Sequence, residues 1–163
     1  MTGARIVAKS WLDREFKAKL LKDARGAVRK WMPSLLTPGN GEPIDTWNVT
    51  HLEVLENTEN LRNVVVCTLC SCYPRGMLGE PPEWYTSDDY KERVIREPKK
   101  VLTEMGNNLK DGVKVRVYDS TADIRYLVIP ERPRGTKGWS EEQLAKLVTR
   151  DSLIGVSDAL KPN

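Results

Sequence analysis

Three cysteines crowd into six residues of this 163-residue chain, at Cys67, Cys70 and Cys72, directly after the apolar run Val64-Val65-Val66. A short run of β-branched residues predicts a buried strand, and the prolines and glycines after the cysteines predict irregular structure as far as Ser87. We therefore expect the three thiols on a loop at the end of a strand, where they lie within reach of one metal ion.

The rest of the composition describes one globular domain. The chain is 39% hydrophobic and 30% charged. Its 163 residues are enough for one hydrophobic core and too few for two. Its formal net charge of +3 is spread along the sequence, which excludes a basic nucleic-acid-binding tract. No apolar run approaches the roughly 20 residues of a membrane span, and an odd cysteine cluster is not the framework of a secreted protein. We expect a cytoplasmic protein with neither nucleic acid nor membrane as a partner.

Hydrophobic periodicity predicts a helical segment at the start of the chain. Residues 4–32 are typical of one long amphipathic helix that breaks near Gly26. Crowded prolines and glycines then predict a loop over 33–46. A metal-binding core is expected over 47–156, and the whole of 1–163 is treated as one domain.

The predicted core mixes strands with short helices. Beside the strand at Val64, helices are expected over 87–96, 98–106 and 140–151, and strands over 113–117 and 124–129. The last two strands are expected to pair with each other around Asp119, and Ser140 with Gln143 forms a capping box that opens the closing helix. Helices, then strands, then a closing helix predict an α+β fold and not a βαβ alternation.

Four explanations of the cysteine cluster remain open on the residues alone. The thiols could be buried and structural, since free cysteine behaves as a small hydrophobe. They could bind zinc, which would require His51 as a fourth ligand, or Cys67 and Cys70 could form a redox pair. In the fourth explanation, the backbone nitrogens of Ser71 and Cys72 complete a set of thiolate ligands. Such donors favour a trivalent transition ion with one position open for chemistry.

The cysteine segment resembles a known motif. The metal-binding motif of nitrile hydratase α subunits, and of the related thiocyanate hydrolase catalytic subunit, is similar to the segment Val66-Cys67-Thr68-Leu69-Cys70-Ser71-Cys72-Tyr73-Pro74. The similarity continues through Pro82-Glu83-Trp84-Tyr85, residues 119–126, Pro130-Glu131-Arg132-Pro133 and Gly138-Trp139-Ser140, and ends at Arg150-Asp151-Ser152. It covers nearly the whole chain and implies a layered α-β-β-α domain with an N-terminal helical segment.

The resemblance also implies the ligands of the metal. Cys67 would be the axial thiolate, Cys70 and Cys72 would be equatorial and become sulfinate and sulfenate, and the amides of Ser71 and Cys72 would bind. In the family, threonine at the position of Thr68 goes with cobalt and serine with iron. Low-spin Co(III) is therefore expected, ahead of Fe(III) or zinc, with the Cys72 sulfenate as nucleophile or base in hydrating a nitrile to an amide.

The implied partners are protein subunits. In the family, two arginines of a β-type subunit balance the charge of the oxidised sulfurs, so the α chain alone is expected to be incomplete. The resemblance also implies an activator protein that matures the centre, and we expect the chain to form a homodimer or a heteromer in preference to a lasting monomer. Thiocyanate hydrolysis and a non-catalytic zinc or metal-transfer module are the alternative functions.

Four further residues match family positions near the metal, and each also has a structural explanation. Asp119, Asp123 and Arg125 would support the cluster through hydrogen bonds, yet a turn and the solvated face of a strand explain them too. Asn48 would lie near the substrate, although a polar residue that opens a strand needs no such role.

Two departures from the usual pattern concern the metal loop and the N-terminus. Arg75 stands where most nitrile hydratases have tryptophan. Thiocyanate hydrolase resembles this chain at that position, and the positive charge of Arg75 would favour an anionic substrate. Pairing across a subunit interface would explain Arg75 equally well. The short N-terminus resembles enzymes whose β component is split into two chains, as in nucleoside nitrile hydratases of the toyocamycin type.

Overall fold

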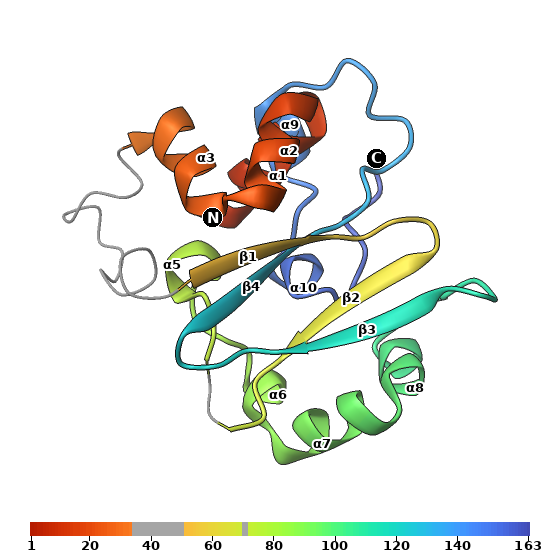
Figure 1. Cartoon of the computed structure of the whole chain (residues 1–163). Coiled ribbons are helices and arrows are strands. Elements are labelled where there is room, and N and C mark those ends of the chain that lie inside the picture. Colours follow the sequence, from red (N-terminus) through yellow and green to blue (C-terminus); the bar gives the residue numbers. More distant parts are fainter. Residues whose placement is uncertain (34–50, 70–71) are drawn as a thin grey trace.

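The computed structural model describes residues 1–33, 51–69 and 72–163, and Figure 1 shows how their elements are arranged. The helices are α1 (Thr2–Leu12), α2 (Arg14–Lys22), α3 (Ala24–Trp31), α5 (Arg75–Leu78), α6 (Glu83–Thr86), α7 (Asp88–Arg96), α8 (Pro98–Glu104), α9 (Glu141–Ala145) and α10 (Arg150–Leu153). The strands are β1 (His51–Glu56), β2 (Leu61–Val66), β3 (Lys114–Asp119) and β4 (Ile124–Ile129). This mixture of helices and strands confirms the predicted α+β class.

The strands form two parallel pairs, β1 with β4 and β2 with β3. The predicted pairing of the strands on either side of Asp119 was therefore wrong. Apolar alternation and turn residues identify strands but not their partners, and the short connection after β3 carries the chain from one pair to the other. In a parallel pair both strands end at the same edge, so the β2–β3 pair brings the residues after Val66 next to those after Asp119.

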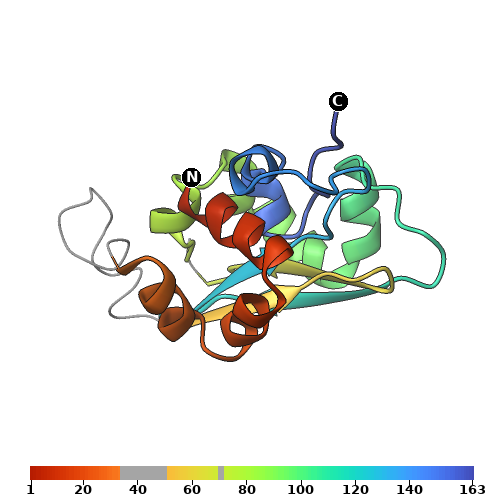
Figure 2. The ribbon, with the colours of Figure 1, turned by 90° about the horizontal axis from the view of Figure 1, so that it is seen from above.

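Helices cover both sides of the strands. Helices α2 and α3 pack against β1, α10 packs on β4 and α8 on β3. Figure 2 shows α2 and α3 on one side of the strands and α8 and α10 on the other. The buried core between them is continuous and includes fully buried Val64, Val65 and Val66 of β2. This burial confirms the strand predicted before the cysteines.

The N-terminal segment is helical as predicted, but it breaks at different residues. Asp13 and Asp23 separate α1, α2 and α3, and each caps the next helix: Asp13 accepts from the Phe16 amide at 2.9 Å and Asp23 from the Gly26 amide at 2.9 Å. Gly26 lies inside α3, where a Cβ would stand 2.1 Å from the Asp23 carboxylate. The glycine accommodates the cap and does not break the helix.

For the remaining helices, the predicted N-caps agree with the structure better than the predicted helix lengths do. Ser87 caps α7, and Ser140 with Gln143 forms the predicted capping box of α9. The predicted closing helix nevertheless ends at Ala145, and α10 begins after a second capping box at Thr149. Two short helices, α5 and α6, also occupy the stretch predicted to be irregular, because single turns fit between its prolines and glycines.

Part of the sequence prediction falls outside the described residues. This applies to 34–46 of the expected loop, to the start of the core at Trp47, and to Asn48. Among the described helices, none is both long and apolar enough to cross a lipid bilayer.

Candidate metal centre

The cysteine segment begins where two parallel strands end together. Val66, the last residue of β2, is paired with Asp119, the last residue of β3, and the Ser120 amide donates to the Val66 carbonyl at 2.7 Å. Cys67 therefore leaves the sheet beside Ser120, at the carboxyl edge where polar groups from neighbouring strands converge. The predicted position of the cysteines, on a loop at a strand end, is confirmed for Cys67.

Asp119 holds the first turn of the segment. One carboxylate oxygen accepts the Thr68 amide at 2.9 Å and the other accepts the Thr68 hydroxyl at 2.5 Å. Two bonds from one side chain to a single residue fix both the backbone and the side chain of Thr68. The contact gives Asp119 a direct connection to the cysteine segment.

The two described cysteines are buried, whereas Leu69 between them is exposed. Cys67 is 0% and Cys72 8% exposed, whereas Leu69 is 89% exposed. The other two predicted ligand residues, Cys70 and Ser71, lie outside the described residues. The segment thus turns two thiol-bearing residues inward and one leucine outward.

A buried tyrosine from α6 holds the far end of the segment. The Tyr85 hydroxyl donates to the Cys72 carbonyl at 3.2 Å, and the side chain is 0% exposed. Its ring makes edge-to-face contact with Tyr73, with the centroids 5.0 Å apart. Burial raises the pKa of Tyr85, and Tyr90 and Cys67 raise it further, so the phenol keeps its proton. Pro82-Glu83-Trp84-Tyr85 belongs to the family-like stretches, but sequence reasoning gave Tyr85 no role.

Three other predicted site residues, Arg75, Asp123 and Arg125, differ in the contacts that they make. Arg75 opens α5 beside the segment, but its guanidinium pairs with the Glu80 carboxylate of the same chain at 3.0 Å. Arg125 donates to the carbonyl of Ala122 at 3.2 Å and to that of Thr121, so it supports the turn after Asp119. The Asp123 side chain makes no hydrogen bond or ion pair with another described residue. Asp119, by contrast, hydrogen-bonds directly to the cysteine segment at Thr68.

The cysteine segment offers donors that suit a soft transition ion more than a hard one. Within residues 1–33, 51–69 and 72–163, no three His, Cys, Asp or Glu side chains meet to form a metal site, and His51 does not join Cys67 and Cys72. His51 instead lies at the exposed start of β1, 3.6 Å from Glu53. A carboxylate site for magnesium or calcium is therefore absent from the described part of the chain. Thiolates from a three-cysteine segment fit cobalt or iron.

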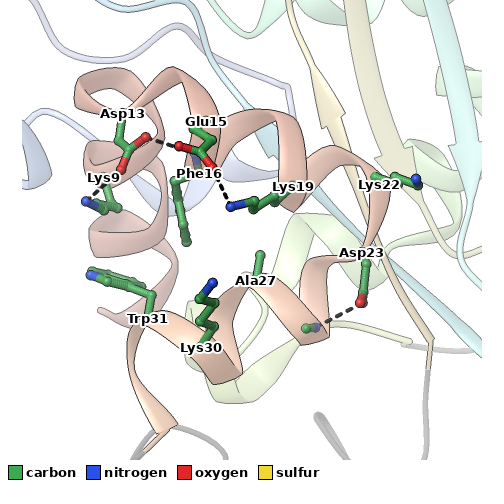
Figure 3. A pocket seen from close by; sticks show the side chains of 11 residues that line it. Lys9, Asp13, Glu15, Phe16, Lys19, Lys22, Asp23, Ala27, Lys30 and Trp31 are labelled. Carbon is green, nitrogen blue, oxygen red and sulfur yellow. Dashed lines mark hydrogen bonds and ion pairs between the residues drawn. The ribbon is translucent and has the colours of Figure 1, made fainter.

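A hollow elsewhere on the molecule is separate from this segment. It has a volume of about 540 Å³ and lies between α1, α2 and α3, over an apolar floor that includes Phe16, Ala27 and Trp31 (Figure 3). Two ion pairs, Lys9 with Asp13 and Lys19 with Glu15, are among its lining residues. Its lining includes no cysteine, so the hollow is not part of the metal site predicted from the sequence.

Comparison with known proteins agrees with this geometry. The family model for the nitrile hydratase α chain matches residues 1–157. The chain is 50% identical, over 163 residues, to the α subunit of the high-molecular-weight cobalt-containing nitrile hydratase of Rhodococcus rhodochrous, and covers 75% of that subunit. It is 48% identical, over 161 residues, to the γ subunit of thiocyanate hydrolase from Thiobacillus thioparus, and covers 65% of it.

Solved structures give the same result. An iron-type nitrile hydratase from Comamonas testosteroni matches with a TM-score of 0.84 and 42% identity, covering 99% of this chain and 73% of that one. A thiocyanate hydrolase with one arginine replaced by tryptophan matches with a TM-score of 0.86 and 44% identity, covering 98% and 74%. The described fold, the cysteine segment at its strand edge and these matches together show that the chain belongs to the nitrile hydratase α-chain family.

Proposed function

We propose that this chain is the metal-carrying catalytic subunit of a cobalt-type nitrile hydratase, which hydrates a nitrile to an amide. The observation that carries the proposal is the cysteine segment itself. It leaves a parallel strand edge with Cys67 and Cys72 buried, and with Thr68 bound by Asp119. Relatives that contain cobalt, at 48 to 50% identity, support the choice of metal.

In this proposal, Cys67, Cys70 and Cys72 hold the ion with the backbone amides of Ser71 and Cys72. When bound, Co(III) supplies a Lewis acid that polarises the nitrile or a water molecule. Cys70 and Cys72 would be oxidised to sulfinate and sulfenate by dioxygen, the oxidant that supplies the added oxygen atoms, and the Cys72 sulfenate would serve as nucleophile or base. The chain's own contribution is to hold these groups in place: Asp119 fixes Thr68 and Tyr85 fixes the Cys72 carbonyl.

The proposal includes further protein partners. A β-type subunit, in one chain or split into two, covers the segment and balances the charge of its oxidised sulfurs. An activator protein delivers the cobalt. Leu69, two residues after the buried Cys67, is 89% exposed, and a partner that covers the segment would bury it.

Thiocyanate hydrolysis is the competing reaction, since the γ subunit of that enzyme is nearly as similar. The sequence argument for it was the positive charge of Arg75. That charge is paired with Glu80 within the chain, which weakens its attraction for an anionic substrate.

The test uses the chain coexpressed with its β-type and activator partners in cobalt medium. We expect about one cobalt per chain and a mass increase of three oxygens, assigned by peptide mapping to Cys70 and Cys72. A panel of nitriles should give amides, while thiocyanate should give no carbonyl sulfide. A Cys72→Ser variant serves as the inactive control.

Three results would contradict the proposal. Zinc in place of cobalt would favour a structural site, and unmodified cysteines would exclude the oxidised centre. Release of carbonyl sulfide and ammonia from thiocyanate, without nitrile hydration, would identify the competing hydrolase.

A further inference from the structure

Tyr85 contacts the far end of the cysteine segment. Its hydroxyl donates to the Cys72 carbonyl at 3.2 Å, and its side chain is 0% exposed. Tyr85 belongs to α6, so this bond links a helix outside the cysteine segment to the last of its three cysteines.

The tyrosine is rigid enough for its hydroxyl to act as a fixed donor. Tyr73 packs edge-to-face on its ring with centroids 5.0 Å apart, Tyr90 lies at 5.9 Å and Trp84 at 6.1 Å. Rings packed on several sides cannot change rotamer without disturbing the core. This packing restricts the Tyr85 ring and so fixes the position of its hydroxyl.

We propose that Tyr85 is a positioning residue that holds Cys72 in the conformation required for metal binding and for oxidation of its sulfur. The inference rests on the proposed function and adds to it a group from α6, outside the cysteine segment. A hydrogen bond to the Cys72 carbonyl restricts the backbone on both sides of that carbonyl, and so the direction of the Cys72 thiol. Asp119 anchors the segment at Thr68 and Tyr85 anchors it at Cys72.

The chain provides a matched control in Tyr90. This tyrosine is also buried, and its hydroxyl donates to a backbone carbonyl, that of Val65, at 2.8 Å. Val65 lies within β2, where the sheet already holds the backbone. Tyr85→Phe and Tyr90→Phe each remove one hydroxyl from the same aromatic cluster, but only the first removes a bond to the cysteine segment.

The experiment compares both variants with the unmodified chain, each copurified with the partner subunits. We measure cobalt affinity by chelator competition, the oxidation state of Cys70 and Cys72 by peptide mass, the sulfur-to-cobalt charge-transfer absorption, and thermal unfolding. Tyr85→Phe should bind cobalt about 10- to 100-fold more weakly, the range for lost outer hydrogen bonds at metal sites. Its absorption band should shift and Cys72 should be incompletely oxidised, while Tyr90→Phe keeps the unmodified values.

Equal cobalt affinity and absorption in Tyr85→Phe and the unmodified chain would overturn the inference. Equal losses in both variants would overturn it too, because they would indicate a role in core packing alone. Absence of cobalt from the unmodified complex is a different outcome, since it would refute the proposed function together with the inference.

Discussion

At the scale of single residues, the Asp119 carboxylate uses its two oxygens for two different groups of Thr68. One oxygen accepts the backbone amide and the other the hydroxyl. A carboxylate is suited to this because it accepts at both oxygens, and the parallel β2–β3 register puts it next to Val66. The side chain that matched a family position thus has a physical role in shaping the segment.

The role of Asp119 can be measured through the Thr68 amide proton. Asp119→Ala removes both bonds, and the Thr68 amide should exchange with solvent about two- to tenfold faster, as expected for net hydrogen-bond energies of about 0.5–1.5 kcal/mol. Asp119→Asn should restore most of the protection, because the carboxamide can accept the amide and donate to the hydroxyl.

The control for this experiment is Asp123→Ala, since the Asp123 side chain makes no hydrogen bond to another described residue. Hydrogen exchange followed by NMR or mass spectrometry distinguishes the three variants. Unchanged exchange in Asp119→Ala, or an equal effect of Asp123→Ala, would show that the Asp119 contact does not order the segment.

At the scale of elements, the strand that leads to Cys67 is supported by a close crossing with the end of α10. The Val65 amide donates to the Ile154 carbonyl at 3.0 Å, and the next residue, Gly155, has φ +82°. A Cβ at Gly155 would stand 1.8 Å from the Asn63 carbonyl oxygen. Only glycine permits this crossing, because both the backbone conformation and the space exclude a side chain.

Gly155→Ala should therefore destabilise the chain by about 2–5 kcal/mol, combining the cost of positive φ with forced movement of β2. Gly138→Ala is the matched control, because Gly138 has φ +80° and a Cβ added there would meet nothing within 4 Å. It should cost only about 1–2 kcal/mol. Urea unfolding gives both values, and equal midpoints for the two variants would contradict the predicted backbone clash.

The sequence predicted the elements better than their pairing. Local signals identified Ser87 and Ser140 as caps, because a hydroxyl that accepts from the following turn acts within a few residues. Strand partners depend on distant contacts, so the parallel β2–β3 pair was missed. Tyr85 was missed for the same reason: its contact with Cys72 depends on how α6 packs, which no local spacing reveals.

At the scale of the whole molecule, the buried and exposed apolar residues show which part of the site this chain provides. Cys67, Cys72 and Tyr85 are buried in or beside one continuous core, so the chain's own core supports the cysteine segment on its inner side. Leu69, at the outside of that segment, has no such cover. A β-type partner that covers the cysteine segment, as proposed, is therefore expected to bury Leu69.

This expectation makes Leu69 the residue whose substitution should weaken subunit association most directly. Burying a leucine side chain contributes about 1.5–3 kcal/mol, so Leu69→Ser should raise the Kd for the β-type partner about 10- to 100-fold. Leu160→Ser is the control, because Leu160 is also exposed, at 51%, but belongs to the C-terminal segment and not to the cysteine segment. Its Kd should stay within about twofold of the unmodified value, as for a surface change of about 0.5 kcal/mol or less. Isothermal titration of each cobalt-loaded chain with the partner measures both constants. Equal Kd values for Leu69→Ser and the unmodified chain would mean that the partner leaves the outside of the metal segment open to solvent.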